Sequence, residues 1–102
     1  MLSNSEYQIK LKEDLQMMTY KGGNGLDSKE AIIIVGAKDE LEGIDGEYIW
    51  LEEKYGEQDF GWELIDQQSI DEGDKKYDIL KIKFLNGEER EFWFDITDFY
   101  GK

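Results

Sequence analysis

Hydrophobic positions near the N-terminus follow a helical period. Between residues 7 and 18 a set of apolar residues recurs at spacings of four, four and three, which places them on one face of a helix. Ser3 and Glu6 precede this stripe with the spacing of a capping box. The pattern predicts a helix from Asn4 to about Lys21, ended by two glycines. Alternation within residues 7–11 is the competing pattern and is typical of a strand.

The middle of the chain combines a β-branched run with a second helical stripe. Residues 31–35 are apolar at consecutive positions, which is typical of a strand covered on both faces. A helix is predicted over residues 46–55, with Asp45 as N-cap and Gly56 as C-cap. A start at Glu40 is the alternative, but it places two glycines inside the helix at a cost of about 1 kcal/mol each. The inward stripe is expected to be Ile44, Tyr48, Leu51 and Tyr55, and the more exposed positions Glu47, Trp50, Glu53 and Lys54.

The C-terminal half alternates as strands do. It predicts an antiparallel meander of three strands, at residues 62–70, 77–84 and 88–96, with the first turn at residues 71–74. In the second turn, a three-residue loop with Gly87 in the left-handed conformation opposes Phe84 to Glu88. This register sets two lysines opposite two glutamates, whereas a two-residue loop sets like charges together. We therefore expect the bulged hairpin.

The predicted order of elements is α-β-α-β-β-β. It indicates an α+β fold in a single domain over residues 1–102, with a mostly antiparallel sheet and two helices packed on one face. The aromatic share of 14% favours a packed core over disorder.

Charge adds a functional hypothesis to this fold. The chain has 25 acidic and 12 basic side chains, for a formal net charge of -13. Residues 39–78 hold 15 of the acids against three lysines, while the other 62 residues hold 10 acids and nine bases. Such a concentration of negative charge speeds encounters with a basic partner. It disfavours direct binding to nucleic acid or to an anionic membrane.

The absence of cysteine and histidine excludes several kinds of chemistry. Disulfide frameworks, thiolate or imidazole metal sites and nucleophiles activated by histidine all need these residues. The glycine-rich loop at residues 22–25 lacks the lysine and hydroxyl residue of a P-loop, so we expect a plain turn there. We predict no catalysis, no cofactor and no metal. The N-terminus does not resemble a signal peptide and no apolar run is long enough to span a membrane, so a cytoplasmic location is the default expectation.

Aromatic side chains interleave with the central acids and suggest how a partner would be held. Rings anchor protein interfaces, and surrounding charges steer the approach. The candidate partner-binding residues are Glu47, Trp50, Glu53, Glu57, Asp59, Trp62 and Glu63. The predicted function is non-catalytic occlusion of a basic protein surface, the strategy of immunity proteins and of inhibitors that mimic nucleic acid. The alternative is a small structural or housekeeping domain, self-associating through the outer face of its sheet, whose acidity serves solubility only.

Overall fold

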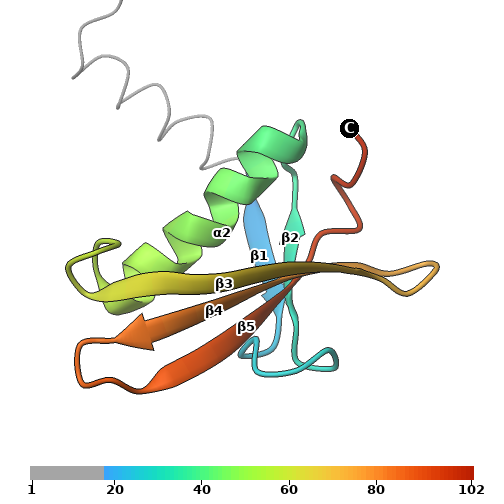
Figure 1. The fold of residues 1–102 in the computed structure, drawn as a ribbon. Helices are drawn as coiled ribbons and strands as arrows, with labels where there is room; N and C mark the ends of the chain where they lie inside the picture. The colour runs from blue at the N-terminus through green and yellow to red at the C-terminus, as the bar shows by residue number, and fades with distance from the viewer. Residues whose placement is uncertain (1–17) are drawn as a thin grey trace, which may run out of the picture.

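The computed structural model describes residues 18–102, which form one helix and five strands (Figure 1). In chain order the elements are β1 (Thr19–Gly22), β2 (Ile32–Val35), α2 (Glu40–Tyr55), β3 (Trp62–Asp71), β4 (Lys76–Phe84) and β5 (Glu89–Asp95). The strands form one sheet in the order β1-β2-β5-β4-β3, and α2 lies against one face of it (Figure 1). The predicted α+β class is confirmed for this part of the chain.

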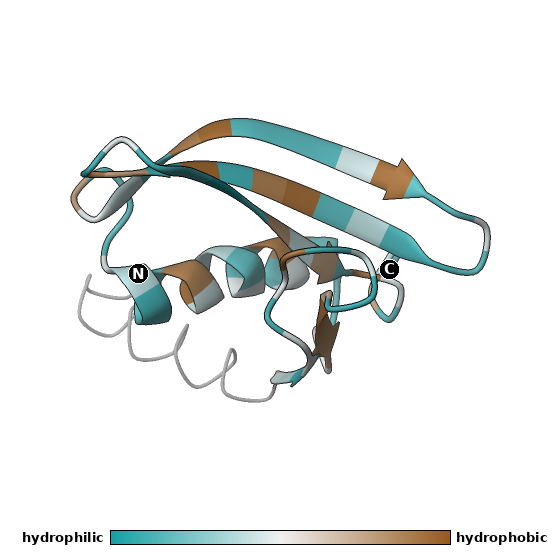
Figure 2. Cartoon of the chain, turned by 90° about the horizontal axis from the view of Figure 1, so that it is seen from below, coloured by the Kyte–Doolittle hydropathy of each residue, from teal (hydrophilic) through white to brown (hydrophobic). Residues whose placement is uncertain are grey.

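The sheet is mixed rather than wholly antiparallel. β2 runs parallel to β5, with Ile32 opposite Phe94, while β1–β2, β3–β4 and β4–β5 are antiparallel pairs. The strand predicted at residues 31–35 is β2, and it lies inside the sheet between β1 and β5. In hydropathy colouring β2 is hydrophobic throughout, whereas the meander strands carry both hydrophobic and hydrophilic positions (Figure 2). Three of the four strand pairs are antiparallel, as the expectation of a mostly antiparallel sheet requires, and the β2–β5 pair is parallel.

The first predicted helix, residues 4–21, is wrong where the structure describes it. Residues 4–17 lie outside the described residues, and Thr19–Gly22 is strand β1 instead. Tyr20 pairs with Ile34 of β2, and its hydroxyl donates a 2.7 Å hydrogen bond to the Gly46 carbonyl of α2. Threonine and tyrosine favour a half-buried sheet position. Pairing with β2 provides such a position in the sheet. Residues 18–102 therefore contain one helix in place of the two predicted for the whole chain.

The meander of β3, β4 and β5 is confirmed together with its register. Lys81 lies opposite Glu91, as the bulged hairpin requires. The backbone N–H of Phe84 donates to the carbonyl of Glu88 at 2.8 Å, and Gly87 has a φ of 89°. A positive φ is accessible to glycine without steric cost, so the turn sequence fixes this hairpin.

Helix α2 begins six residues before the expected start, at the alternative position Glu40. Its N-cap is Asp39, whose side chain accepts a 2.9 Å hydrogen bond from the Glu42 N–H, so the prediction of Asp45 as N-cap is wrong. The predicted C-cap is confirmed, since the N–H of Gly56 donates to the Glu52 carbonyl at 2.9 Å.

Close packing explains the two glycines inside the helix. A Cβ on Gly43 would overlap the ring of Phe99, and a Cβ on Gly46 would press on the end of Met18 at 3.1 Å. The glycines therefore lower helix propensity but let neighbouring segments reach the helix backbone. The inward side consequently includes Gly43, Glu47 and Leu51, while Ile44, expected inward, is 36% exposed.

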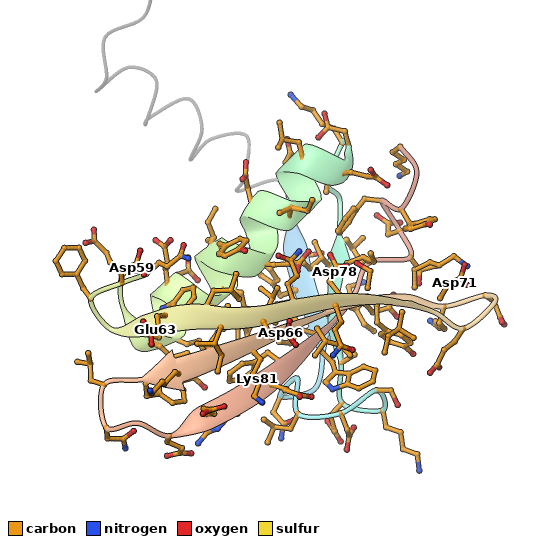
Figure 3. The ribbon with its side chains drawn as sticks, viewed as in Figure 1. Asp59, Glu63, Asp66, Asp71, Asp78 and Lys81 are labelled. Atoms are coloured by element: carbon orange, nitrogen blue, oxygen red, sulfur yellow. The ribbon has the colours of Figure 1, made fainter. Side chains whose placement is uncertain are left out.

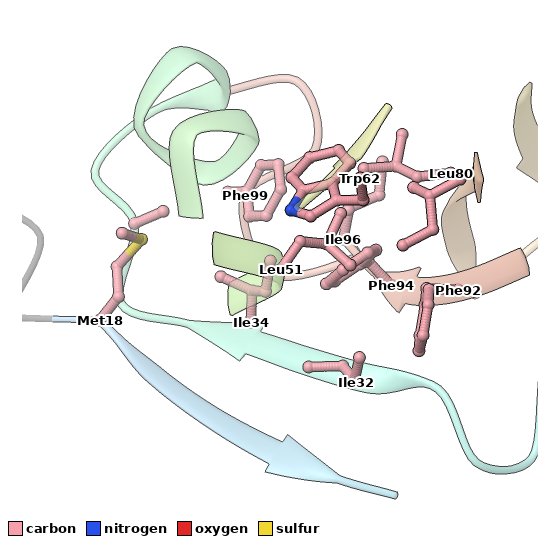
Figure 4. Packing of buried hydrophobic residues seen from close by; sticks show 12 residues of the cluster. Met18, Ile32, Ile34, Leu51, Trp62, Leu80, Phe92, Phe94, Ile96 and Phe99 are labelled. Atoms are coloured by element: carbon pink, nitrogen blue, oxygen red, sulfur yellow. The ribbon is translucent and has the colours of Figure 1, made fainter. Parts of the chain in front are cut away.

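A hydrophobic core fills the space between α2 and the sheet (Figure 4). Tyr48, Trp50 and Tyr55 are partly buried against it. Its members come from every described element except β1, and from the segments beside them: Met18, Ile32, Ile34, Ala37, Leu51, Trp62, Leu80, Ile82, Phe92, Phe94, Ile96 and Phe99. The core holds α2 and the start of β3 in fixed positions, and the exposed acids lie beside them.

Candidate functional site: an acidic tip and a buried acid pair

The fold divides the acidic residues of segment 39–78 into buried, paired and exposed groups. Glu42, Glu47 and Asp78 are buried, with 8%, 1% and 5% of their surface exposed. Asp71 forms a 2.6 Å ion pair with Lys76, and the hydrogen bond from that lysine lowers the pKa of Asp71. The negative charge offered to a partner is therefore smaller than the sequence count indicates.

Lysines of β4 reduce the negative charge along β3 further. In the strand register Glu63 lies opposite Lys83, and Asp66 lies opposite Lys81. Lys81 also forms a 3.4 Å ion pair with Glu89 of β5. Within residues 18–102, the acids where α2 ends and the chain turns into β3 take part in none of the ion pairs.

Exposed acids gather in that turn. Between residues 52 and 63 the exposed acids are Glu52, Glu53, Glu57, Asp59 and Glu63, against the single base Lys54. We call the group formed by Glu57, Asp59, Phe60, Glu63 and Leu85 the acidic tip. Figure 3 shows Asp59 and Glu63 at one end of β3 and Asp71 at the other.

The loop of the acidic tip is tied down by hydrogen bonds. The Asp59 N–H donates to the Trp62 carbonyl at 2.6 Å, and the Phe60 N–H donates to the Glu57 carbonyl at 3.1 Å. The indole Nε1 of Trp62 donates to the Gly56 carbonyl at 2.8 Å. Asp59 has a φ of 70°, the left-handed conformation that aspartate tolerates better than most residues. The loop therefore presents its side chains from a defined backbone.

Two large apolar side chains project from the same region. Phe60 is 74% exposed and Leu85, in the turn between β4 and β5, is 83% exposed. An open pocket of about 220 Å³ lies beside Leu85, lined by Asp59, Trp62, Glu63, Lys83, Phe84 and Leu85 itself. The acidic tip thus combines carboxylates with apolar surface around one concavity.

The predicted partner-binding residues separate into two sets. Glu53, Glu57, Asp59 and Glu63 are exposed, and the last two line the pocket. Glu47, Trp50 and Trp62 are not exposed: Glu47 and Trp62 are each 1% exposed, and Trp50 is half-buried. Trp50 packs on Phe92 and Phe94 at ring distances of 5.5 and 5.8 Å.

For Glu47 the expectation of an exposed position is therefore wrong, because its helical turn faces β4. The sequence pattern placed Phe60 among the aromatic side chains of the acidic segment but not among the candidate residues, and it missed Leu85. The available signal was a large apolar residue inside a short polar turn, in Gln58-Asp59-Phe60-Gly61 and in Leu85-Asn86-Gly87.

Glu47 belongs to a second feature, a buried acid pair between α2 and β4. Burial raises the pKa of Glu47 to about 10, and a hydrogen bond to Asp78 and the charge of Asp78 raise it in the same direction. Glu47 Oε2 receives no hydrogen bond within residues 18–102, whereas Asp78 Oδ1 accepts one from Ser69 Oγ at 2.7 Å. At neutral pH Glu47 is therefore protonated, and its carboxyl group forms a hydrogen bond with Asp78.

This pair has no access to solvent. Two carboxyl groups that share a proton are suited to acid–base catalysis only where a substrate reaches them, and the burial of both groups prevents that. We therefore treat the pair as structural and the acidic tip as the candidate functional site. In the part of the chain that the structure describes, no group of three or more metal-ligating side chains is present.

Comparisons with known proteins assign neither a family nor a function to this chain. No protein-family model, curated protein or solved structure matches the chain. Among residues 18–102, α2 is neither long enough nor apolar enough to cross a membrane. The interpretation of the site consequently rests on its own geometry and charge.

Proposed function

We propose that this chain is a non-catalytic binding protein that covers a basic surface of another protein with its acidic tip. The observation that carries the proposal is the meeting of exposed carboxylates with two exposed apolar side chains, on a hydrogen-bonded loop and on the neighbouring β4–β5 turn. Carboxylates speed the approach of a basic partner, and apolar side chains that lose contact with water supply affinity. Occlusion of the partner's surface is the resulting activity.

The placement of the charges supports a binding role over solubility alone. Glu52 and Glu53 lie in the last turn of α2 and Glu57 follows it, while Lys54 is the basic residue of that turn. The C-terminal end of a helix carries partial negative charge, so acids there cost stability. Solubility needs no such position, because a carboxylate at an exposed site elsewhere serves it equally well.

Self-association by strand pairing at the β3 edge of the sheet has less support. β3 is an edge strand, but its pairing with β4 shifts register between Leu64 and Asp66. The side chain of Asp66 also accepts a 2.9 Å hydrogen bond from the backbone N–H of Gln67. Irregular pairing and inserted charges are ways in which proteins block an exposed edge against further strands.

A pair of matched charge variants tests the proposal. Glu57→Gln with Asp59→Asn removes one glutamate and one aspartate from the acidic tip. Glu72→Gln with Asp74→Asn removes the same two residue types from the exposed turn between β3 and β4. Immobilised wild-type and variant proteins are used to capture partners from a lysate of the source cell at low salt, and association with the captured protein is then measured at increasing salt.

We expect the tip variant to lose about tenfold in association rate and the turn variant to retain the wild-type rate, because steering depends on local charge. The wild-type rate should fall steeply as salt rises. Equal losses in both variants would point to net charge alone. No loss in either would reject the acidic tip as the binding surface.

A further inference from the structure

The apolar residues of the acidic tip have no evident role inside the fold. Gly87 supplies the positive φ that the β4–β5 turn needs, and Leu85 meets no such requirement there. Phe60 projects from its loop with 74% of its surface exposed, while neighbouring Trp62 is buried in the core. Single exposed apolar residues are common in soluble proteins. Here Leu85 lines the pocket and Phe60 follows Asp59, which lines it too, so the two together call for an explanation.

The pocket has the size of a side-chain site. Its volume of about 220 Å³ lies below the range of roughly 300–1,000 Å³ that is typical of small-molecule and cofactor pockets. Trp62, Phe84 and Leu85 supply its apolar lining. One apolar side chain from a protein partner fits these walls better than a whole small molecule.

Charge around the pocket narrows the chemistry of the ligand. Asp59 and Glu63 line it, and Glu57 lies on the same loop, so positive charge is favoured at the rim. Lys83 also lines the pocket, and its positive charge disfavours a cationic group of the ligand inside the pocket. A second copy of this chain is disfavoured as the occupant because each copy has a formal net charge of -13.

We propose that the acidic tip recognises a lysine- or arginine-rich segment that carries one large apolar side chain. The apolar side chain enters the pocket beside Leu85 and contacts Trp62 and Phe84, while flanking cations bind Asp59 and Glu63. This inference rests on the proposed function and adds the chemical pattern of the ligand. Phe60, exposed next to Asp59 on the same loop, then closes over the inserted side chain.

Two synthetic peptides serve as probes. One consists of lysines and arginines around a single central leucine, and the other has glycine in place of that leucine. Both carry a fluorescent label at one end, and binding to the full chain is followed by fluorescence anisotropy. We expect the leucine peptide to bind wild-type protein about tenfold more tightly, since partial burial of one leucine side chain supplies a factor of that order.

Protein variants then locate the leucine. Phe60→Ala with Leu85→Ser should remove the tenfold preference of wild-type protein for the leucine peptide. Leu41→Ala is the matched control, because Leu41 is 70% exposed on the first turn of α2 and lies outside the pocket. Circular dichroism verifies that each variant remains folded, and these exposed positions contribute little to the core.

The outcomes separate this inference from the proposed function. If the two peptides bound wild-type protein equally and both lost affinity for Glu57→Gln with Asp59→Asn, the proposal of an apolar pocket would be overturned. The proposal of an acidic binding surface would stand. A leucine preference that survives in Phe60→Ala with Leu85→Ser would also overturn the apolar pocket. If neither peptide bound in a charge-dependent way, the proposed function would fail together with the inference.

Discussion

Replacing Glu47 by glutamine tests the buried acid pair that joins α2 to β4. Glutamine has nearly the shape of a protonated glutamate and is neutral at every pH, and its amide can donate to Asp78. The substitution therefore keeps the packing of a side chain that is 1% exposed and removes its titration. The expected result is a change in how stability depends on pH.

The pKa difference sets the direction and the size of that change. Folding raises the pKa of Glu47 from 4.5 to about 10, so above pH 4.5 the unfolded chain releases a proton that the folded chain retains. Stability then falls with rising pH, by about 1.4 kcal/mol for each pH unit within this window. Between about pH 5 and pH 8 the loss is about 4 kcal/mol, a large part of the roughly 5–15 kcal/mol that stabilises a typical domain.

Urea unfolding followed by tryptophan fluorescence measures the effect. Wild-type protein should lose stability between about pH 5 and pH 8, while Glu47→Gln stays nearly level over the same range. The variant should thus be close to wild type at pH 5 and more stable at pH 8. Glu53→Gln is the control, because this glutamate is exposed on the same helix and its replacement should leave the wild-type slope intact.

Parallel slopes for wild type and Glu47→Gln would refute the reasoning. They would mean that Glu47 is ionised in the folded protein, or that the unfolded chain holds its proton equally well. Asp71 and Asp95 do not contribute to the slope between pH 5 and pH 8, because their pKa values are lowered from 3.8 and lie outside this range.

Two further substitutions test the packing that positions the acidic tip. Trp62→Phe removes the hydrogen bond from the indole Nε1 to the Gly56 carbonyl, and we expect a loss of at least about 1 kcal/mol in urea unfolding. Unchanged stability would show that this bond does not hold the loop. Gly43→Ala forces a methyl group into the ring of Phe99, and we expect thermal or urea unfolding to report a loss of about 1–3 kcal/mol. A more stable variant would show that helix propensity outweighs this contact.

Local chemistry made the meander predictable. A turn glycine, opposite charges in register and alternating side chains all lie within a short stretch of sequence, so no distant segment was needed to select the β4–β5 pairing. The start of α2 was less predictable because Gly43 and Gly46 disfavour a helix locally. Phe99, far along the chain, supplies the reason for a glycine at position 43.

The candidate site was predictable in its charge and not in its apolar part. Glu57, Asp59 and Glu63 fall in polar turns and near a strand end, where exposure is the ordinary outcome. Glu47 differs because the helix phase is set by contacts with the sheet, and the raised pKa of Glu47 lets this side chain be buried without a charge. Leu85 was passed over because one apolar residue in a turn is ordinary, and its 83% exposure is what shows that it has no place in the core.

The position of β5 in the middle of the sheet has a consequence for how the protein is made. β2 emerges from the ribosome early, yet one of its two neighbours in the sheet is β5, which is synthesised last of the strands. Ile32 therefore cannot pair with Phe94 until β5 has been made. Until then one side of β2 exposes backbone groups and β-branched side chains to other nascent chains. Contacts between segments so distant in sequence also slow folding. We therefore expect synthesis that stops before β5 to leave an aggregation-prone product rather than a smaller folded domain.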